Sequence, residues 1–174
     1  MVFLMPEPVF PQASSALRIL INPYADVAHA RAIFELLDSY ARDPMGGGNG
    51  LDPSVRRDLV PELRRRPWAI TLLALDGEKP VGLLIGMEGF STFIARPLLN
   101  IHDVAVHPDY RNRGVGSALF AEAEKIALKR GCCKLTLEVL SGNERAKRLY
   151  KRIGFKPYAL NPENGGAEFW DKAI

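Results

Sequence analysis

Two arginines and two glycines stand close together in the segment Arg111-Asn112-Arg113-Gly114-Val115-Gly116, between an apolar run and a helical pattern. Glycines at a strand-to-helix turn let the backbone adopt positive φ angles, and they let a ligand approach the main-chain amides closely. The first N–H groups of the helix have no internal partner, and the helix dipole is positive there. A phosphate group is the natural guest of such a turn, and the arginines add permanent positive charge.

Three kinds of turn compete for this segment. A P-loop needs Lys-Ser/Thr after its second glycine, but Ser117 follows directly without a lysine. A dinucleotide-binding turn needs a third glycine or alanine where Leu119 stands, although Glu138 on the next predicted strand keeps this alternative open. The third alternative is a glycine turn whose arginines face only solvent, and the turn by itself does not exclude it.

A second set of regularly spaced residues follows the next predicted strand: Asn143, Ala146, Leu149, Tyr150, Gly154 and Phe155. Together with the glycine turn, this set resembles the GNAT superfamily of N-acetyltransferases, which bind acetyl-CoA. The pyrophosphate loop of that family has the form Gln/Arg-x-x-Gly-x-Gly/Ala, and its second signature is Asn-x-x-Ala-x-x-Leu/Phe-Tyr followed by Gly-Phe. The resemblance is close over residues 98–158 and extends to the remaining chain by the order of its elements.

The resemblance implies where acetyl-CoA would bind. In the family, a central strand separates from its neighbour at a bulge, and its main-chain groups bind the pantetheine arm. In this sequence the corresponding residues are Val104, Ala105 and Val106. The phosphates would lie on the turn, at Arg111, Asn112, Arg113, Gly114, Val115, Gly116 and Ser117. On the following helix the expected contacts are Asn143, Ala146, Lys147 and Tyr150, of which Asn143 equally suits a helix N-cap.

The resemblance also implies catalytic roles. An alkylamine has a pKa of about 10.4 and must lose a proton before it attacks the thioester, so a base or a water chain is needed. His102 is our first candidate for the base and Asp103 the second, with a buried structural carboxylate as the alternative for Asp103. Strict strand alternation would point these neighbours to opposite faces. Tyr150 matches the general acid of the family, and its alternative is a core tyrosine.

We expect the acceptor to be a primary amine of a small molecule, because the region before the central strand is similar to relatives that acetylate small amines. In this fold the acceptor is chosen by the first two helices and by that region, where Phe90 and Phe93 suit either a pocket wall or the core. Two alternatives remain open: acetylation of a protein or peptide amine, and a non-catalytic acyl-CoA-binding module that acts as a sensor. Many relatives are dimers, so a homodimer is a further expectation, although the sequence shows no interface.

The elements that must position these residues alternate between strands and helices. Strands are predicted at 16–23, 69–75, 81–90, 98–106, 134–140 and 167–173, and helices at 26–41, from 52 onward, at 114–130 and at 143–153. Pro61 is expected to kink or end the second helix, and the glycine-rich segment 43–50 to form a mobile loop. The expected fold class is α/β, a GNAT-type mixed, mostly antiparallel, twisted sheet with helices on both faces.

The composition sets outer limits on function. The chain has 174 residues, of which 47% are hydrophobic and 25% charged, so we expect one domain over 1–174 with a loose arm at 1–14. Its net charge of +3 is too weak to indicate nucleic acid, and no apolar run approaches the ~20 residues that span a membrane. Cys132 and Cys133 are adjacent and predict no disulfide, which favours the cytoplasm. The histidine spacing predicts no metal site.

Overall fold

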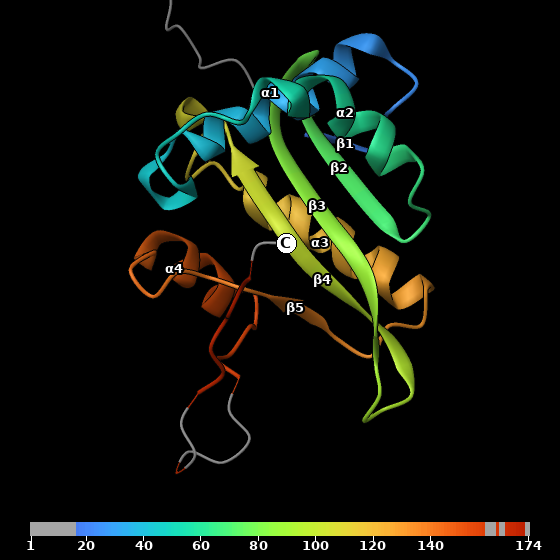
Figure 1. Ribbon diagram of the computed structural model, residues 1–174, viewed down its shortest axis with the longest axis vertical. Helices are drawn as coiled ribbons and strands as arrows, with labels where there is room; N and C mark the ends of the chain where they lie inside the picture. The colour runs from blue at the N-terminus through green and yellow to red at the C-terminus, as the bar shows by residue number, and fades with distance from the viewer. Residues whose placement is uncertain (1–16, 159–162, 164–165, 173–174) are drawn as a thin grey trace, which may run out of the picture.

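A computed structural model describes residues 17–158, 163 and 166–172. Its centre is a five-stranded sheet in the order β1-β2-β3-β4-β5 (Figure 1). The strands are β1 (Arg18–Ile21), β2 (Ala69–Asp76), β3 (Lys79–Ser91), β4 (Arg96–Val106) and β5 (Leu135–Leu137). The first four pair antiparallel with their neighbours, and β5 runs parallel to β4. The predicted mixed, mostly antiparallel sheet is therefore confirmed.

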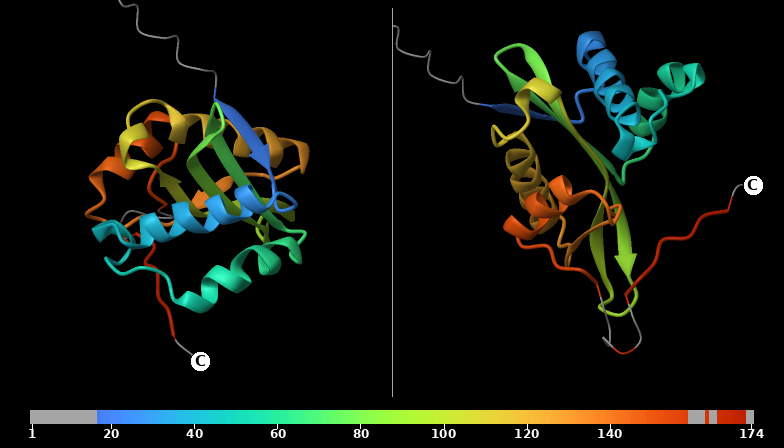
Figure 2. Two further views of the ribbon diagram at one scale, coloured as in Figure 1. Left: turned by 90° about the horizontal axis from the view of Figure 1, so that it is seen from above. Right: turned by 90° about the vertical axis from the view of Figure 1, so that its left-hand side faces the viewer.

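Helices cover both faces of the sheet, as predicted. On one face lie α1 (Val27–Ala41) and α2 (Pro53–Arg64), and on the other lie α3 (Val115–Lys129) and α4 (Glu144–Arg152) (Figure 2). Two short 3-10 turns, η1 (Pro44–Gly46) and η2 (Pro108–Tyr110), follow α1 and β4. Within the described residues, none of the helices is both long and apolar enough to cross a bilayer.

The strand β2 explains why both faces need cover. Its side chains alternate between two hydrophobic clusters, so that Ile70 and Leu72 pack toward α3 while Leu73 and Leu75 pack toward α1. All four are fully buried. Burial of each such side chain contributes about 1.5–3 kcal/mol of hydrophobic free energy, so the sheet depends on both helical layers.

The helices α1 and α2 both begin directly after an aspartate that caps them. The carboxylate of Asp26 caps α1 by accepting from the His29 N–H at 2.9 Å, and Asp52 caps α2 in the same way. The helix α2 continues through Pro61 to Arg64, so of the two predicted outcomes, a kink or an end at this proline, the end is wrong. Val27, at the start of α1, is 85% exposed, because the buried face of the helix is formed by residues further along it.

Two predicted strands differ from the structure. Residues 167–172, expected as a last strand, have no regular secondary structure, and residue 173 lies outside the described residues. The strand predicted at 134–140 is reduced to β5, because only three of its residues pair with β4. The predicted N-terminal arm also lies outside the described residues. The glycine-rich segment 43–50 contains the turn η1, which the sequence did not indicate.

A glycine in β3 sets the position of α3. A Cβ atom at Gly82 would lie 2.5 Å from Cγ1 of Val115 and 3.1 Å from Cδ1 of Leu119. The missing side chain therefore lets the first turn of α3 approach the sheet closely. This contact fixes where the glycine turn before α3 meets the end of β4.

Candidate active site

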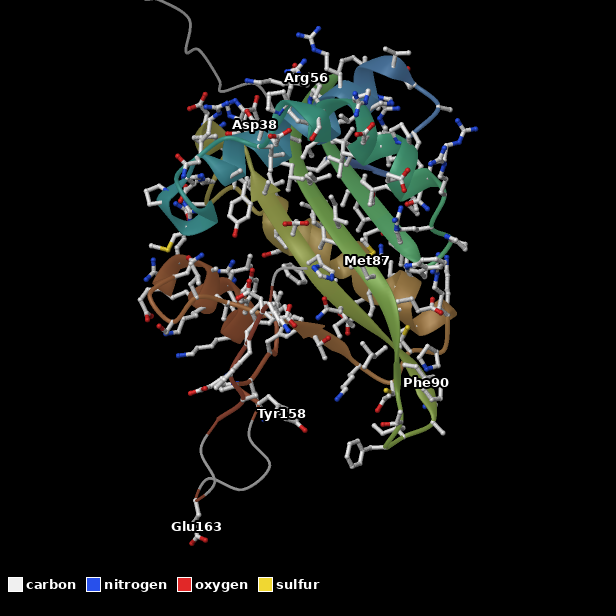
Figure 3. All side chains as sticks on the ribbon, in the orientation of Figure 1. Asp38, Arg56, Met87, Phe90, Tyr158 and Glu163 are labelled. Atoms are coloured by element: carbon white, nitrogen blue, oxygen red, sulfur yellow. The ribbon has the colours of Figure 1, made fainter. Side chains whose placement is uncertain are left out.

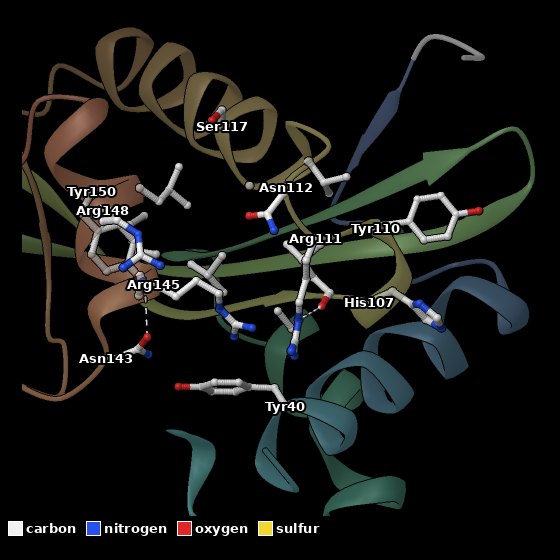
Figure 4. Close-up of a pocket in the computed structure, with 18 of the residues that line it drawn as sticks. Tyr40, His107, Tyr110, Arg111, Asn112, Ser117, Asn143, Arg145, Arg148 and Tyr150 are labelled. Atoms are coloured by element: carbon white, nitrogen blue, oxygen red, sulfur yellow. Dashed lines mark hydrogen bonds between the residues drawn. The ribbon is translucent and has the colours of Figure 1, made fainter. Parts of the chain in front are cut away.

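The candidate site begins where β4 and β5 separate. Their parallel pairing joins Leu99, Asn100 and Ile101 to the three residues of β5, but β4 continues to Val106 while β5 ends at Leu137. A cleft opens beyond this point, lined by the end of β4, the glycine turn, α3, α4 and the end of α1 (Figure 4). The divergence exposes the main chain of β4 to the cleft.

The direction of the β4 main chain follows from one hydrogen bond. The His107 N–H donates to the Val81 carbonyl at 2.9 Å, toward β3. Because main-chain groups alternate along a strand, those of Val104 and Val106 point the other way, into the cleft. The Val106 carbonyl accepts from Nε of Arg111 at 3.4 Å, which agrees with this direction. Val104, Ala105 and Val106 all line the cleft, as predicted.

The expected bulge lies at His102, earlier than predicted. Ile85 of β3 faces Asp103 and Gly86 faces Ile101, so His102 is the extra residue in the ladder. Strict alternation is interrupted here, and the expectation that His102 and Asp103 point to opposite faces loses its basis. Ala105 packs in the α1 cluster, so Asp103, two residues before it, lies on the same face as α1.

The glycine turn has the backbone that its sequence predicts. Asn112 and Gly114 both adopt left-handed conformations, with φ angles of 62° and 86°. Gly114 is the N-cap of α3, and it has no side chain to satisfy the first helical N–H groups. A Cβ at Gly116 would lie 3.0 Å from Cδ2 of Leu149, so this glycine also allows α3 and α4 to approach each other. Six of the seven turn residues line the cleft: Arg111, Asn112, Gly114, Val115, Gly116 and Ser117.

The basic residues predicted for the phosphates divide into two groups. Arg111 lines the cleft, and its Nη2 donates to Oδ2 of Asp43 at 3.0 Å. Arg113 lies outside the cleft lining, with its guanidinium 5.2 Å from the centre of the Tyr110 ring. Lys147 also lies outside it, because its Nζ donates to the Ser141 carbonyl and to the Glu144 carboxylate. The structure therefore does not bring Arg113 and Lys147 to the site.

The N-terminal end of α4 contributes the residues that its motif predicts. Oδ1 of Asn143 accepts from the Ala146 N–H at 3.1 Å, which makes Asn143 the N-cap of α4. Asn143, Ala146 and Tyr150 also line the cleft, so capping and a place in the site are compatible. Arg145 and Arg148 add two positive charges that the prediction did not assign to the site.

Tyr150 is half-buried between the two helices of its face. Its ring meets Phe120 edge to face at 5.5 Å and lies 6.0 Å from Phe155, between ring centroids. Burial, with a smaller contribution from Tyr40, raises its pKa from 10.0 to about 12. The hydroxyl therefore stays protonated at neutral pH and is able to donate a proton or a hydrogen bond.

The two base candidates occupy different environments. His102 is exposed and lines the cleft. Asp103 is half-buried and does not line it, and burial raises the pKa of its carboxyl, with His102 acting in the opposite direction. Of the pair, His102 has the better access to a bound amine.

Sequence reasoning missed Tyr40, which reaches the cleft from the end of α1 (Figure 4). Its hydroxyl donates to the Met45 carbonyl at 3.2 Å. Burial raises its pKa, and the carboxylates of Asp103 and Asp43 act in the same direction. Tyr40 stands three residues after the buried Leu37, and this helical spacing was the signal that would have placed it on the inward face.

The aromatic residues proposed for the acceptor pocket lie elsewhere. Phe93 is 99% exposed and Phe90 is 62% exposed, at the end of the β3–β4 hairpin (Figure 3). Neither lines the cleft nor joins the core. The core alternative for these two residues is therefore wrong, and their place in an acceptor pocket stays a prediction.

Comparison with known proteins identifies the family. The model of the acetyltransferase (GNAT) family matches residues 31–155. This stretch includes both motifs and most of the sheet, and the chain therefore belongs to the GNAT family of acetyltransferases. Family membership argues against the dinucleotide-binding alternative for the glycine turn.

Individual relatives match parts of the chain. Thialysine N-epsilon-acetyltransferase of Bos taurus is 40% identical over 87 residues, which make up 48% of this chain and 51% of the relative. Glucosamine 6-phosphate N-acetyltransferase of Trypanosoma brucei brucei is 28% identical over 104 residues, 57% of this chain and 67% of the relative. The chain thus spans about half the length of the bovine relative.

The fold is shared with solved structures. The crystal structure of a possible acetyltransferase from Clostridium difficile 630 superposes with a TM-score of 0.74 and 20% sequence identity. The superposition covers 91% of this chain and 98% of the other. At this identity the likeness concerns the fold alone.

Proposed function

We propose that this protein is an N-acetyltransferase that transfers the acetyl group of acetyl-CoA directly to a primary amine of a small molecule. The observation that carries the proposal is the divergence of β4 and β5 beside the glycine turn and Tyr150. One cleft is thus lined by three features that the reaction needs: the exposed main chain of β4, the N-terminus of α3, which suits phosphates, and the protonated phenol of Tyr150. The family membership supports the same donor.

The residues present fit acetyl-CoA. The N-cap Gly114 leaves the first N–H groups of α3 without a side-chain acceptor, which suits a phosphate at this end of the cleft. The inward main-chain groups of Val104 and Val106 suit the amides of a pantetheine arm. When bound, acetyl-CoA would supply the activated acetyl group.

The chain itself would manage the protons of the reaction. His102 would take the proton of the incoming amine, directly or through water, because it faces the cleft and imidazoles titrate near neutral pH. Tyr150 would hold its hydroxyl proton and donate it toward the departing thiolate. The main chain of β4 would orient the carbonyl that develops charge.

A small-molecule acceptor is supported by the relatives whose names state one. Thialysine and glucosamine 6-phosphate are both small molecules that carry a primary amine. Tyr40 and Asp103 lie on the α1 side of β4, where aromatic and carboxylate groups suit a cationic amine. The predicted homodimer and cytoplasmic location stay predictions.

The test is release of coenzyme A thiol over a panel of acceptors: thialysine, lysine, glucosamine 6-phosphate, a polyamine, an aminoglycoside and a peptide with a free N-terminus. Turnover with a small amine is expected. Turnover with the peptide alone would favour protein acetylation, and tight binding of acetyl-CoA without any turnover would favour a non-catalytic module. If calorimetry detects no binding of acetyl-CoA, the proposal is wrong.

A further inference from the structure

We infer that Asp43 is an internal anion at the phosphate end of the cleft, which the pyrophosphate of the donor displaces when it binds. The inference rests on the proposed function, because it assumes that Arg111 and the glycine turn receive that pyrophosphate. It adds a link between donor binding and the segment 43–50, which separates α1 from α2 and borders the acceptor side.

Asp43 contacts Arg111, a residue of the cleft lining, from a segment 68 positions away in the sequence. Its Oδ2 lies 3.0 Å from Nη2 of Arg111 and 3.9 Å from Nη2 of Arg145. The side chains of Asp43 and Arg111 are only 16% and 28% exposed. Its other oxygen, Oδ1, accepts from the Met45 N–H at 3.0 Å and so caps the turn η1. The carboxylate thus has one oxygen for the turn and one for the arginines.

A phosphate would use the same donors as this carboxylate. Guanidinium groups bind carboxylates and phosphates with the same charge-assisted hydrogen bonds. The Met45 N–H, and then Arg111, lower the pKa of the Asp43 carboxyl, so it is ionised at neutral pH and available to compete. Nε of Arg111 is held by the Val106 carbonyl, which leaves its outer nitrogens as the contested donors.

Displacement of Asp43 would free the turn η1. The Met45 carbonyl in this turn accepts from the Tyr40 hydroxyl at 3.2 Å, so movement of η1 also changes the surroundings of Tyr40. Gly47 and Gly48 follow the turn with φ angles of 109° and 80°, and a Cβ on either would meet nothing within 4 Å. The far end of the segment is held by Asp38, which accepts from the Leu51 N–H at 2.8 Å. Of the two ends of the segment, the Asp43 end is therefore the one that contacts Arg111.

The substitution Asp43→Asn isolates the charge. The amide oxygen of asparagine retains an acceptor for the Met45 N–H, while the negative charge facing Arg111 and Arg145 is lost. We expect calorimetry to show about threefold to tenfold tighter binding of coenzyme A and of inorganic pyrophosphate, in line with the modest strength of partly exposed ion pairs. The matched control is Asp52→Asn, which removes the same charge from the segment before α2 but acts on a carboxylate that accepts from Ser54.

Hydrogen exchange of the amides in 43–50 gives a second, independent measurement. In the wild-type protein, coenzyme A should speed exchange there, whereas in Asp43→Asn exchange should already be fast and coenzyme A should add little. Equal or weaker binding by Asp43→Asn, an equal gain in Asp52→Asn, or unchanged exchange in the wild type would each overturn the inference and leave the proposed function standing. Failure of the wild type to bind coenzyme A would instead overturn the proposed function, and the inference with it.

Discussion

The ring of Tyr150 on α4 meets the ring of Phe120 on α3 edge to face, with their centroids 5.5 Å apart. This contact holds the phenol at the wall of the cleft and removes it from water, which is the main reason why its pKa is raised. The same packing that stabilises α4 therefore keeps the candidate acid protonated.

Tyr150→Phe should lower turnover by about 100-fold or more with little change in the affinity for acetyl-CoA, because the ring packing remains and only the proton donor is lost. The pKa of about 12 also predicts that Tyr150 itself causes no loss of rate near pH 10.0, the ordinary tyrosine value. Steady-state kinetics and calorimetry test this, with the exposed Tyr158 changed to Phe as the control. A fully active Tyr150→Phe enzyme removes Tyr150 from the acid role.

His102→Gln should lower turnover by about 100-fold, since glutamine cannot take a proton from the amine. The affinity for acetyl-CoA should be unchanged. The control is His29→Gln, because His29 lies near the start of α1 and outside the cleft lining. Undiminished turnover by His102→Gln would assign the base to another group.

Asp103→Asn should raise the free energy of unfolding at neutral pH, because burial raises the pKa of the Asp103 carboxyl and penalises its charge. A raised carboxyl pKa means that the folded state favours the protonated acid. The contribution of Asp103 to the free energy of unfolding is therefore most favourable below the pKa of the unfolded state, and it declines as the pH rises. The stabilisation by asparagine should therefore shrink as the pH falls from the raised pKa of the folded state to the ordinary aspartate value. Urea unfolding at several pH values measures it, and a difference that is constant with pH contradicts the prediction.

Gly82→Ala should destabilise the fold by about 1–3 kcal/mol, because the new methyl group overlaps Val115 and must push α3 away from the sheet. Since Val115 follows Gly114, affinity for acetyl-CoA should fall as well. Gly89→Ala is the control in the same strand, where a Cβ would be in ordinary contact, 3.4 Å from Leu98. Equal stability of the two variants in chemical denaturation would show that α3 can shift without cost.

Gly116→Arg should abolish detectable binding of acetyl-CoA, because a side chain at this point of the turn blocks approach to the main chain and collides with Leu149. Gly142→Arg introduces the same side chain where a Cβ meets nothing within 4 Å, and it should bind normally. Calorimetry of the two variants compares them directly. Normal binding by Gly116→Arg means that the turn is not the phosphate site.

The part of the cleft that we assign to the donor was largely predictable, because the residues that form it are close together in the sequence. The spacing of Arg111, Gly114 and Gly116, and of Asn143 and Tyr150, lies within single turns or helices, where sequence and geometry are directly linked. The start of α1 was equally readable from Asp26. Such features depend on residues within one helical turn of each other.

The features that were missed depend on distant partners. The pairing of Arg111 with Asp43 joins residues 68 positions apart, so no local pattern reveals it. The bulge at His102 depends on the register with Ile85 and Gly86, which the β4 sequence does not encode alone. A strand was predicted at 167–173, but a strand also needs a neighbour with which to pair, and residues 167–172 have no pairing in the described sheet.

The divergence of β4 and β5 has a consequence for how this protein could change over time. On the proposed function, the donor contacts would come from the main chain of Val104 and Val106 and from the turn at Gly114, and such contacts would tolerate exchange of many neighbouring side chains. Tyr40, by contrast, enters the cleft through its side chain, at the end of a surface helix. We therefore expect mutations in α1 to alter which amine is accepted while the donor site persists, which would let a new substrate arise without rebuilding the catalyst.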